Sequence, residues 1–76
     1  MPMTRLPALT PDKLLKIIKK LGFMVVRQHG SHIFLKHKDG RTTVVPYHKG
    51  KDIGRGLLRA ILVDIGMTPK DFEKQL

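Results

Sequence analysis

The sequence predicts an α+β sandwich in which two helices pack on one face of a three-stranded antiparallel sheet and a short helix follows. Three observations predict this fold: apolar residues at helical spacing near both ends of the chain, three β-rich segments between them, and turn signals between those segments. Two helices that each carry one apolar stripe need a shared surface, which one face of the sheet supplies. The other face is then free. At 76 residues, the chain is expected to form one domain, residues 1–76.

The first helix is predicted from its start and stop signals. Thr10 can cap the helix, Pro11 suits its first position, and Asp12 complements the positive helix end. Gly22 is the expected stop. Residues 1–9 carry two prolines and are expected to form an irregular lead-in. The apolar stripe of this helix consists of Leu14, Ile17, Ile18 and Leu21.

The middle of the chain is predicted to form an antiparallel meander of three strands. The β-rich segments are FMVVRQ (23–28), HIFLKHK (32–38) and RTTVVPYH (41–48). HGS (29–31) and Asp39-Gly40 are turn signals. Pro46 indicates that the third strand ends at an edge or a bulge. The register of this strand stays open, because both of its faces carry apolar residues.

Two helices are predicted after a loop at KGKDIG (49–54). Gly66 ends the first of them. Thr68 and Pro69 repeat the capping pattern and start a short last helix that contains Phe72. The longer helix is marked by Leu57, Leu58, Ile61, Leu62 and Ile65.

Positive charge is the strongest global signal. Fifteen Lys and Arg against six Asp and Glu give a net charge of +9 and a pI of about 10.4. A domain this basic attracts polyanions, so nucleic acid is the leading partner class, ahead of an anionic membrane surface or an acidic protein. The alternative is that the lysines only keep a small protein soluble.

Composition excludes several other classes of protein. The chain has no cysteine, which removes disulfides, thiolate ligands and a cysteine nucleophile. The longest apolar runs, FMVV and AILV, are too short to span a bilayer, and no signal-peptide pattern is expected at the start of the chain. A cytoplasmic protein without a membrane partner is expected.

RQHGSHIFLKH (27–37) is the stretch most suggestive of chemistry, because it holds three of the four histidines. Side chains alternate along a strand, so a regular strand places His32, Phe34, Lys36 and Lys38 on one face. The opposite face carries Ile33, Leu35 and His37. An imidazole, a ring and two cations on a free sheet face suit nucleic acid.

His32 is a candidate catalyst of RNA cleavage. An imidazole exchanges a proton near neutral pH, and this reaction needs a base for the 2′-hydroxyl and an acid for the leaving oxygen. Cations stabilise the charge on the phosphorane, and Gly30 and Ser31 can bring backbone N–H groups close to a phosphate. The cations available are Arg27, Lys36 and Lys38. The alternative is an exposed histidine at a strand start, since Gly-Ser-His alone is a weak motif.

Other readings of the polar residues stay open. The four histidines match no zinc spacing, and His32 and His37 point to opposite faces, so no metal is expected. His48 is either a second proton-transfer group or a loop histidine. The start of the second long helix either holds a phosphate or is a solvated basic loop. Its cations are Lys49, Lys51 and Arg55.

LGFMVVRQHGSHIFLKHKDGRTTVVPYHKGKDIGRGLLRAILVDIGMT (21–68) resembles the HicA, or YcfA-like, family of bacterial and archaeal toxins. Each matching piece is short, and their order and spacing carry the resemblance. The matching pieces are Gly22-Phe23, Arg27, Gly30-Ser31-His32, Asp39-Gly40, the VPYH run (45–48) and the helix at 57–66.

The resemblance implies a double-stranded-RNA-binding-like α-β-β-β-α fold and a ribonuclease that cuts mRNA independently of the ribosome. It implies His32 as the catalytic residue, no metal and no cofactor, and inhibition by a HicB-like antitoxin. The residues expected to bind RNA are Arg27, Gly30, Ser31, Lys36, Lys38 and His48. The alternatives are a non-catalytic double-stranded-RNA-binding module and a basic interaction domain without nucleic acid.

Overall fold

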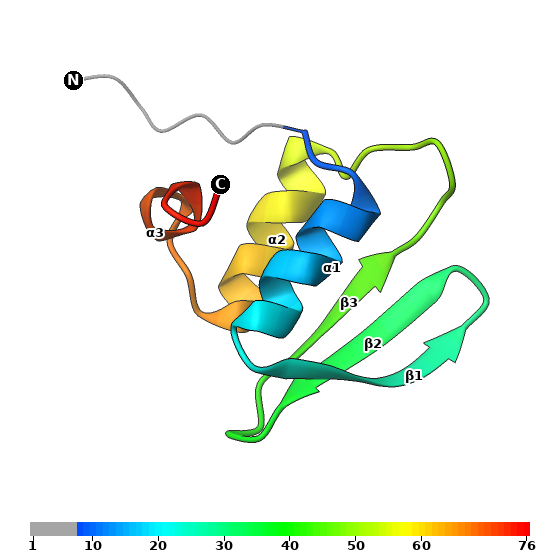
Figure 1. The fold of residues 1–76 in the computed structure, drawn as a ribbon, viewed down its shortest axis with the longest axis horizontal. Helices are drawn as coiled ribbons and strands as arrows, with labels where there is room; N and C mark the ends of the chain where they lie inside the picture. Colours follow the sequence, from blue (N-terminus) through cyan, green and yellow to red (C-terminus); the bar gives the residue numbers. More distant parts are fainter. Residues whose placement is uncertain (1–7) are drawn as a thin grey trace.

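The computed structural model describes residues 8–76, and it confirms the predicted α-β-β-β-α order with a short helix at the end (Figure 1). Most of the predicted irregular lead-in therefore lies outside the described residues. The elements are α1 (Pro11–Lys20), β1 (Phe23–His29), β2 (His32–His37), β3 (Thr42–Pro46), α2 (Arg55–Ile65) and α3 (Pro69–Glu73). The two long helices lie together on one face of the sheet, and α3 lies beside α2.

The capping signals act as predicted at the start of α1 and α3. Thr10 Oγ1 accepts a hydrogen bond of 3.2 Å from the backbone N–H of Lys13, and Thr68 Oγ1 accepts one of 3.1 Å from Asp71. Each bond satisfies a donor that the first helical turn leaves free. At the end of α1, Gly22 adopts φ 101°, a conformation that glycine reaches without strain.

The sheet has the order β1-β2-β3, with both pairs antiparallel, so β2 is the central strand. Its alternation is as predicted, because Ile33 and Leu35 are buried. The structure also settles the register of β3, where Thr43 and Val45 face the helices. The buried Thr43 hydroxyl donates a hydrogen bond of 3.1 Å to Asp64 Oδ2 on α2, which satisfies its polarity.

The predicted second strand is one residue too long. The backbone N–H of His37 donates to the carbonyl of Arg41 at 2.8 Å, and the N–H of Gly40 donates to the carbonyl of His37 at 2.9 Å. These bonds close the turn directly after His37. Lys38 therefore lies in the turn, and the prediction that it shares a strand face with His32 is wrong.

Three other strand ends also differ from the prediction, and one of them is the start of the third strand, which is Thr42 instead of Arg41. His29 continues β1 and pairs with His32, so the turn between the strands is only two residues long. The third strand ends at Pro46, which has no N–H to donate to a ladder. Tyr47 and His48 therefore belong to the loop before α2.

The hydrophobic core lies between the sheet and the helices. Leu9, beside the start of α1, forms an isolated antiparallel bridge with Ile53, and both are buried. Phe72 is fully buried and anchors α3 to the core. Among residues 8–76, no helix is long and apolar enough to cross a membrane. Burial is complete for Leu14, Ile18, Val45 and Leu58.

The turn between β2 and β3 is tied to the end of α2 through Arg41. The Arg41 Nε donates to Asp39 Oδ2 at 2.8 Å, and its Nη1 donates to the carbonyl of Ile65. Its guanidinium also lies 5.2 Å from the ring centroid of Phe23. The hydrogen bonds from Arg41 lower the pKa of Asp39 to about 2. We call this part of the molecule the Asp39 end; it comprises residues 37–41 and 65–66.

Candidate active site

Three chain segments meet at the opposite end of the sandwich, which we call the Ser31 end. It comprises residues 10–12 at the start of α1, residues 30–32 at the β1–β2 turn, and residues 47–52 after β3. Because α1 and β1 run in opposite directions, the start of α1 lies at the same end as the β1–β2 turn (Figure 1). This end holds His, Lys and Tyr side chains, and Arg27 and Phe34 lie on the two strands that lead to it.

The β1–β2 turn is held in place by the end of β3. Gly30 adopts φ 59°, in the left-handed region that favours glycine. The carbonyl of Ser31 accepts a hydrogen bond of 2.6 Å from the backbone N–H of Tyr47. This bond fixes the Gly30-Ser31 turn beside the loop that carries His48.

His32 is exposed at the first position of the central strand, where it lies opposite His29 on β1 and Pro46 on β3. Within residues 8–76, its side chain takes part in no hydrogen bond or ion pair. An imidazole without such a partner keeps both ring nitrogens for a ligand. The backbone around it is fixed on both sides, so the side chain is exposed on a rigid support.

The free face of the sheet carries an arginine stacked on an aromatic ring. The Arg27 guanidinium carbon lies 4.3 Å from the ring centroid of Phe34, directly across the β1–β2 pair. This distance suits a cation–π contact, which holds the guanidinium over the sheet. A shallow hollow of about 510 Å³ surrounds the pair and reaches Lys36 and Val44.

The structure brings only part of the predicted RNA-binding set close to His32. Phe34 is two residues along the strand from His32, or about 7 Å at 3.3 Å per residue, and Arg27 is stacked on it. Lys36 is four residues along, or about 13 Å away. Lys38 lies in the turn at the Asp39 end. The predicted single patch is therefore a track that leads away from His32.

The four histidines do not converge on a metal site. His37 packs edge-on against Phe23, with ring centroids 5.1 Å apart, on the side of the sheet that faces the helices. It lies at the Asp39 end, whereas His32 lies at the Ser31 end. Within the part of the chain that the structure describes, no three His, Asp or Glu side chains gather as a metal would require.

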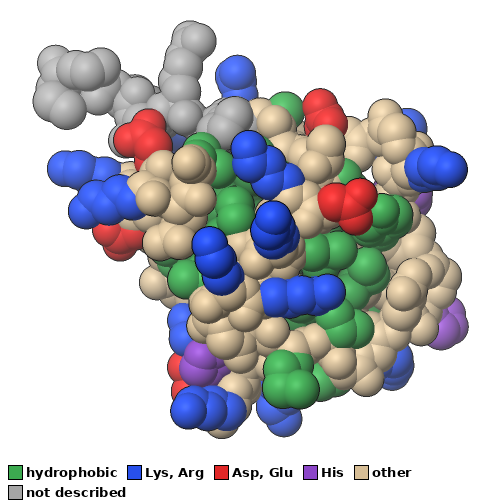
Figure 2. All heavy atoms as spheres, viewed as in Figure 1, with side chains coloured by type: hydrophobic (Ala, Val, Ile, Leu, Met, Phe, Trp, Pro, Cys, Tyr) green, Lys and Arg blue, Asp and Glu red, His purple; other side chains and the backbone are tan. Residues whose placement is uncertain are grey.

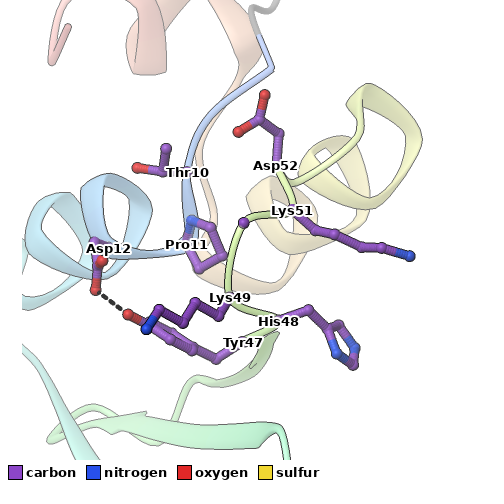
Figure 3. Close-up of a pocket in the computed structure, with 9 residues that line it drawn as sticks. Thr10, Pro11, Asp12, Tyr47, His48, Lys49, Lys51 and Asp52 are labelled. Carbon is purple, nitrogen blue, oxygen red and sulfur yellow. Dashed lines mark hydrogen bonds between the residues drawn. The ribbon is translucent and has the colours of Figure 1, made fainter.

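Sequence reasoning missed a cavity of about 600 Å³ at the Ser31 end (Figure 3). On one side, the hydroxyl of Tyr47 donates a hydrogen bond of 2.8 Å to Asp12 Oδ1, which raises the pKa of Tyr47. These residues are 35 positions apart in the chain, so no local pattern could pair them. The lining residues are Thr10, Pro11, Asp12, Tyr47, His48, Lys49, Gly50, Lys51 and Asp52.

Basic side chains also cover the helical side of the molecule. Figure 2 shows Lys and Arg side chains over much of the face seen in Figure 1, together with several acidic side chains and a hydrophobic stripe. The exposed lysines of α1 contribute to it, namely Lys13, Lys16, Lys19 and Lys20. The charge of the protein is therefore not confined to the free sheet face, and it provides attraction for polyanions over a wide surface.

These observations define the class: a small basic α+β domain that presents an exposed histidine at the start of its central strand. Residues 11–67 match the family model of the HicA toxin of bacterial toxin–antitoxin systems. The chain belongs to this family, which confirms the resemblance seen in the sequence. As a toxin of such a system, it is paired with a cognate antitoxin. A search of characterised proteins gives no match to the chain.

Proposed function

We propose that this toxin is an endoribonuclease that cleaves mRNA without a metal ion, and that His32 is its catalytic residue. The observation that supports the proposal best is the setting of His32. The side chain is exposed and unbonded within residues 8–76, yet the turn before it is fixed by the hydrogen bond between Tyr47 and Ser31. A fixed backbone with an available imidazole is what general acid–base catalysis requires.

The chemistry needs only groups that the Ser31 end provides. Neutral His32 takes the proton of a ribose 2′-hydroxyl, and the oxygen attacks the adjacent phosphorus. The bond from phosphorus to the 5′-oxygen of the next nucleotide breaks, which leaves a 2′,3′-cyclic phosphate and a 5′-hydroxyl. The leaving oxygen takes a proton from an acid, for which His48 is the candidate in the loop beside Ser31.

The remaining residues bind the RNA chain. Arg27, held over the ring of Phe34, is the cation nearest to His32 on the free face and stabilises the charge that develops on phosphorus. Gly30 and Ser31 allow the backbone to approach a phosphate closely. Lys36 binds the RNA further along the track, and Lys38 adds attraction at its far end.

A test of this proposal is incubation of the pure protein with an mRNA fragment and with DNA of the same sequence, in EDTA. We expect the RNA to be cut and the DNA to stay intact, because DNA lacks the attacking 2′-hydroxyl. The new 3′ ends should carry 2′,3′-cyclic phosphates. Cleavage of both polymers, or complete loss of RNA cleavage in EDTA, would contradict the proposed chemistry.

The cognate antitoxin is proposed to be HicB-like and to cover the surface around His32, which we call the catalytic corner and which comprises Arg27, Ser31 and His32. A domain with a net charge of +9 is steered fastest to an acidic surface. An antitoxin with an acidic face can block RNA binding and catalysis together if it covers Arg27, Ser31 and His32. Hydrogen exchange of the complex should then show protection centred on residues 27–36. Protection confined to residues 68–76, with RNA still bound, would indicate allosteric inhibition instead.

A second candidate function is non-catalytic binding of double-stranded RNA. The start of α2 supports it, because Gly54 provides no side-chain cap and the first turn has no acidic residue. The free N–H groups and Arg55 suit a phosphate. A protein that binds duplex RNA without cutting any RNA would favour this function over the first.

A further inference from the structure

The cavity at the Ser31 end has the size of a small-molecule site. Its volume of about 600 Å³ falls in the range that small ligands occupy in proteins. It lies between the first turn of α1 and the loop after β3, and residues from both segments line it. No residue of β1 or β2, the strands that carry Arg27 and Lys36, lines it.

The cavity wall combines cations with carboxylates and an aromatic ring. Lys49 and Lys51 supply positive charge, whereas Asp12 and Asp52 supply negative charge. In Figure 3 the Lys49 side chain runs alongside Tyr47 toward Asp12, and Lys51 points the other way. The carboxylates would repel a simple anion, and the lysines would repel a simple cation. A ligand with a phosphate at one end and N–H donors at the other matches both.

The cavity adjoins the catalytic corner. The same Tyr47 whose ring lines the cavity donates its backbone N–H to the carbonyl of Ser31, one residue before His32. His48 follows Tyr47 directly and also lines the cavity. The loop that lines the cavity is therefore hydrogen-bonded to the turn directly before His32.

We propose that this cavity is a nucleotide subsite that receives one ribonucleotide of the RNA next to the cleaved bond and favours guanine. The proposal rests on the ribonuclease function proposed above. Lys51, which points away from Asp12, binds the phosphate, and the Tyr47 ring offers an aromatic surface on which a base stacks. The Asp12 carboxylate accepts hydrogen bonds from the base.

Guanine is the base that fits a carboxylate best. Its N1–H and N2–H₂ donors lie side by side, so they match the two oxygens of one carboxylate. Adenine and cytosine place an acceptor beside their donor, which a carboxylate repels. The hydrogen bond from Tyr47 fixes the orientation of Asp12 and leaves lone pairs on both of its oxygens for the base.

The test is an NMR titration of the wild-type protein with four probes: GMP, AMP, ribose 5-phosphate and inorganic phosphate. We expect GMP to shift the amide signals of residues 10–12 and 47–52 and to bind about tenfold more tightly than AMP. Equal affinity for all four probes would show an anion site without base recognition and would overturn the proposal. Shifts confined to residues outside these two segments would overturn it as well.

Two variants separate the roles of the lining residues, and a third is their control. Asp12→Asn should make GMP and AMP bind equally, because the amide no longer offers two acceptors. Lys51→Ala should weaken both by about threefold, as loss of an exposed charge contact does. Lys70→Ala, on α3, is the charge-matched control and should change neither affinity. A GMP preference that survives in Asp12→Asn would contradict the assignment of the carboxylate.

The titration does not depend on catalysis, so the two proposals can fail separately. Binding of GMP at residues 10–12 and 47–52 by a protein that cuts no RNA would keep the subsite and reject the ribonuclease function. RNA cleavage without GMP binding in the cavity would do the reverse.

Discussion

The two ends of the sandwich use similar side chains in opposite ways. At the Asp39 end, Arg41, Asp39 and His37 are bonded to one another or to the backbone, and Arg41 reaches the last turn of α2. At the Ser31 end, the side chains of His32 and His48 take part in no hydrogen bond or ion pair within the described residues. Polar side chains that stabilise the fold are satisfied by protein partners, whereas those left without one are available to a ligand.

Substitution at the Asp39 end should therefore lower the stability of the fold and leave the rate of RNA cleavage per folded molecule unchanged. Arg41→Ala removes the bonds to Asp39 and to the carbonyl of Ile65, and the contact with Phe23. We expect it to lower the free energy of unfolding by about 2 kcal/mol, as loss of a charged hydrogen-bond donor with its packing does. Urea unfolding measures this loss. Cleavage per folded molecule should match wild type, and a fall beyond the folded fraction would contradict the division of roles.

Substitution of Arg27, on the track between the two ends, should weaken RNA binding. We expect this effect to be smaller than the effect of Arg41→Ala on stability. Arg27→Ala removes the cation that is stacked on Phe34. If Arg27 neutralises one phosphate, the slope of log affinity against log salt should fall by about one. Filter binding at several salt concentrations measures the slope. The Lys70→Ala control should keep the wild-type slope, and an unchanged slope in Arg27→Ala would remove Arg27 from the RNA contacts.

The smallest expected effect is a pH dependence of stability at the Asp39 end. The pKa of Asp39 is lowered to about 2 in the folded protein, so its carboxylate stabilises the fold above its unfolded value near 4. This stabilisation is lost as the pH falls from about 4 to about 2. Asp39→Asn should therefore lower the melting temperature at pH 6 more than at pH 2. Equal shifts at both pH values would exclude the ion pair as the cause.

Local signals predicted the fold better than they predicted the site. Capping by Thr10 and Thr68 and the alternation of Ile33 and Leu35 depend on neighbours in sequence, so they could be read directly. The register of β3 could not, because Val44 and Val45 are equally apolar and only the buried Thr43–Asp64 hydrogen bond and the helices distinguish the two faces.

The prediction of the site has the same limit, because local sequence patterns do not reveal contacts between distant residues. Gly30-Ser31-His32 is a contiguous motif, so the sequence, through its resemblance to the toxin family, could propose it as a site. The cavity depends on Asp12 and Tyr47, which only the tertiary fold brings together. The error over Lys38 came from treating the second strand as regular to residue 38, when backbone bonds close the turn one residue earlier.

The most direct test of the central claim is the single-turnover rate of RNA cleavage by His32→Ala, measured beside its unfolding curve. His32 is exposed and unbonded within residues 8–76, so the substitution should leave the unfolding midpoint within experimental error of wild type. Loss of a general acid–base group should lower the rate by about a hundredfold or more. A stable variant that cuts RNA at the wild-type rate would show that the chemistry lies elsewhere.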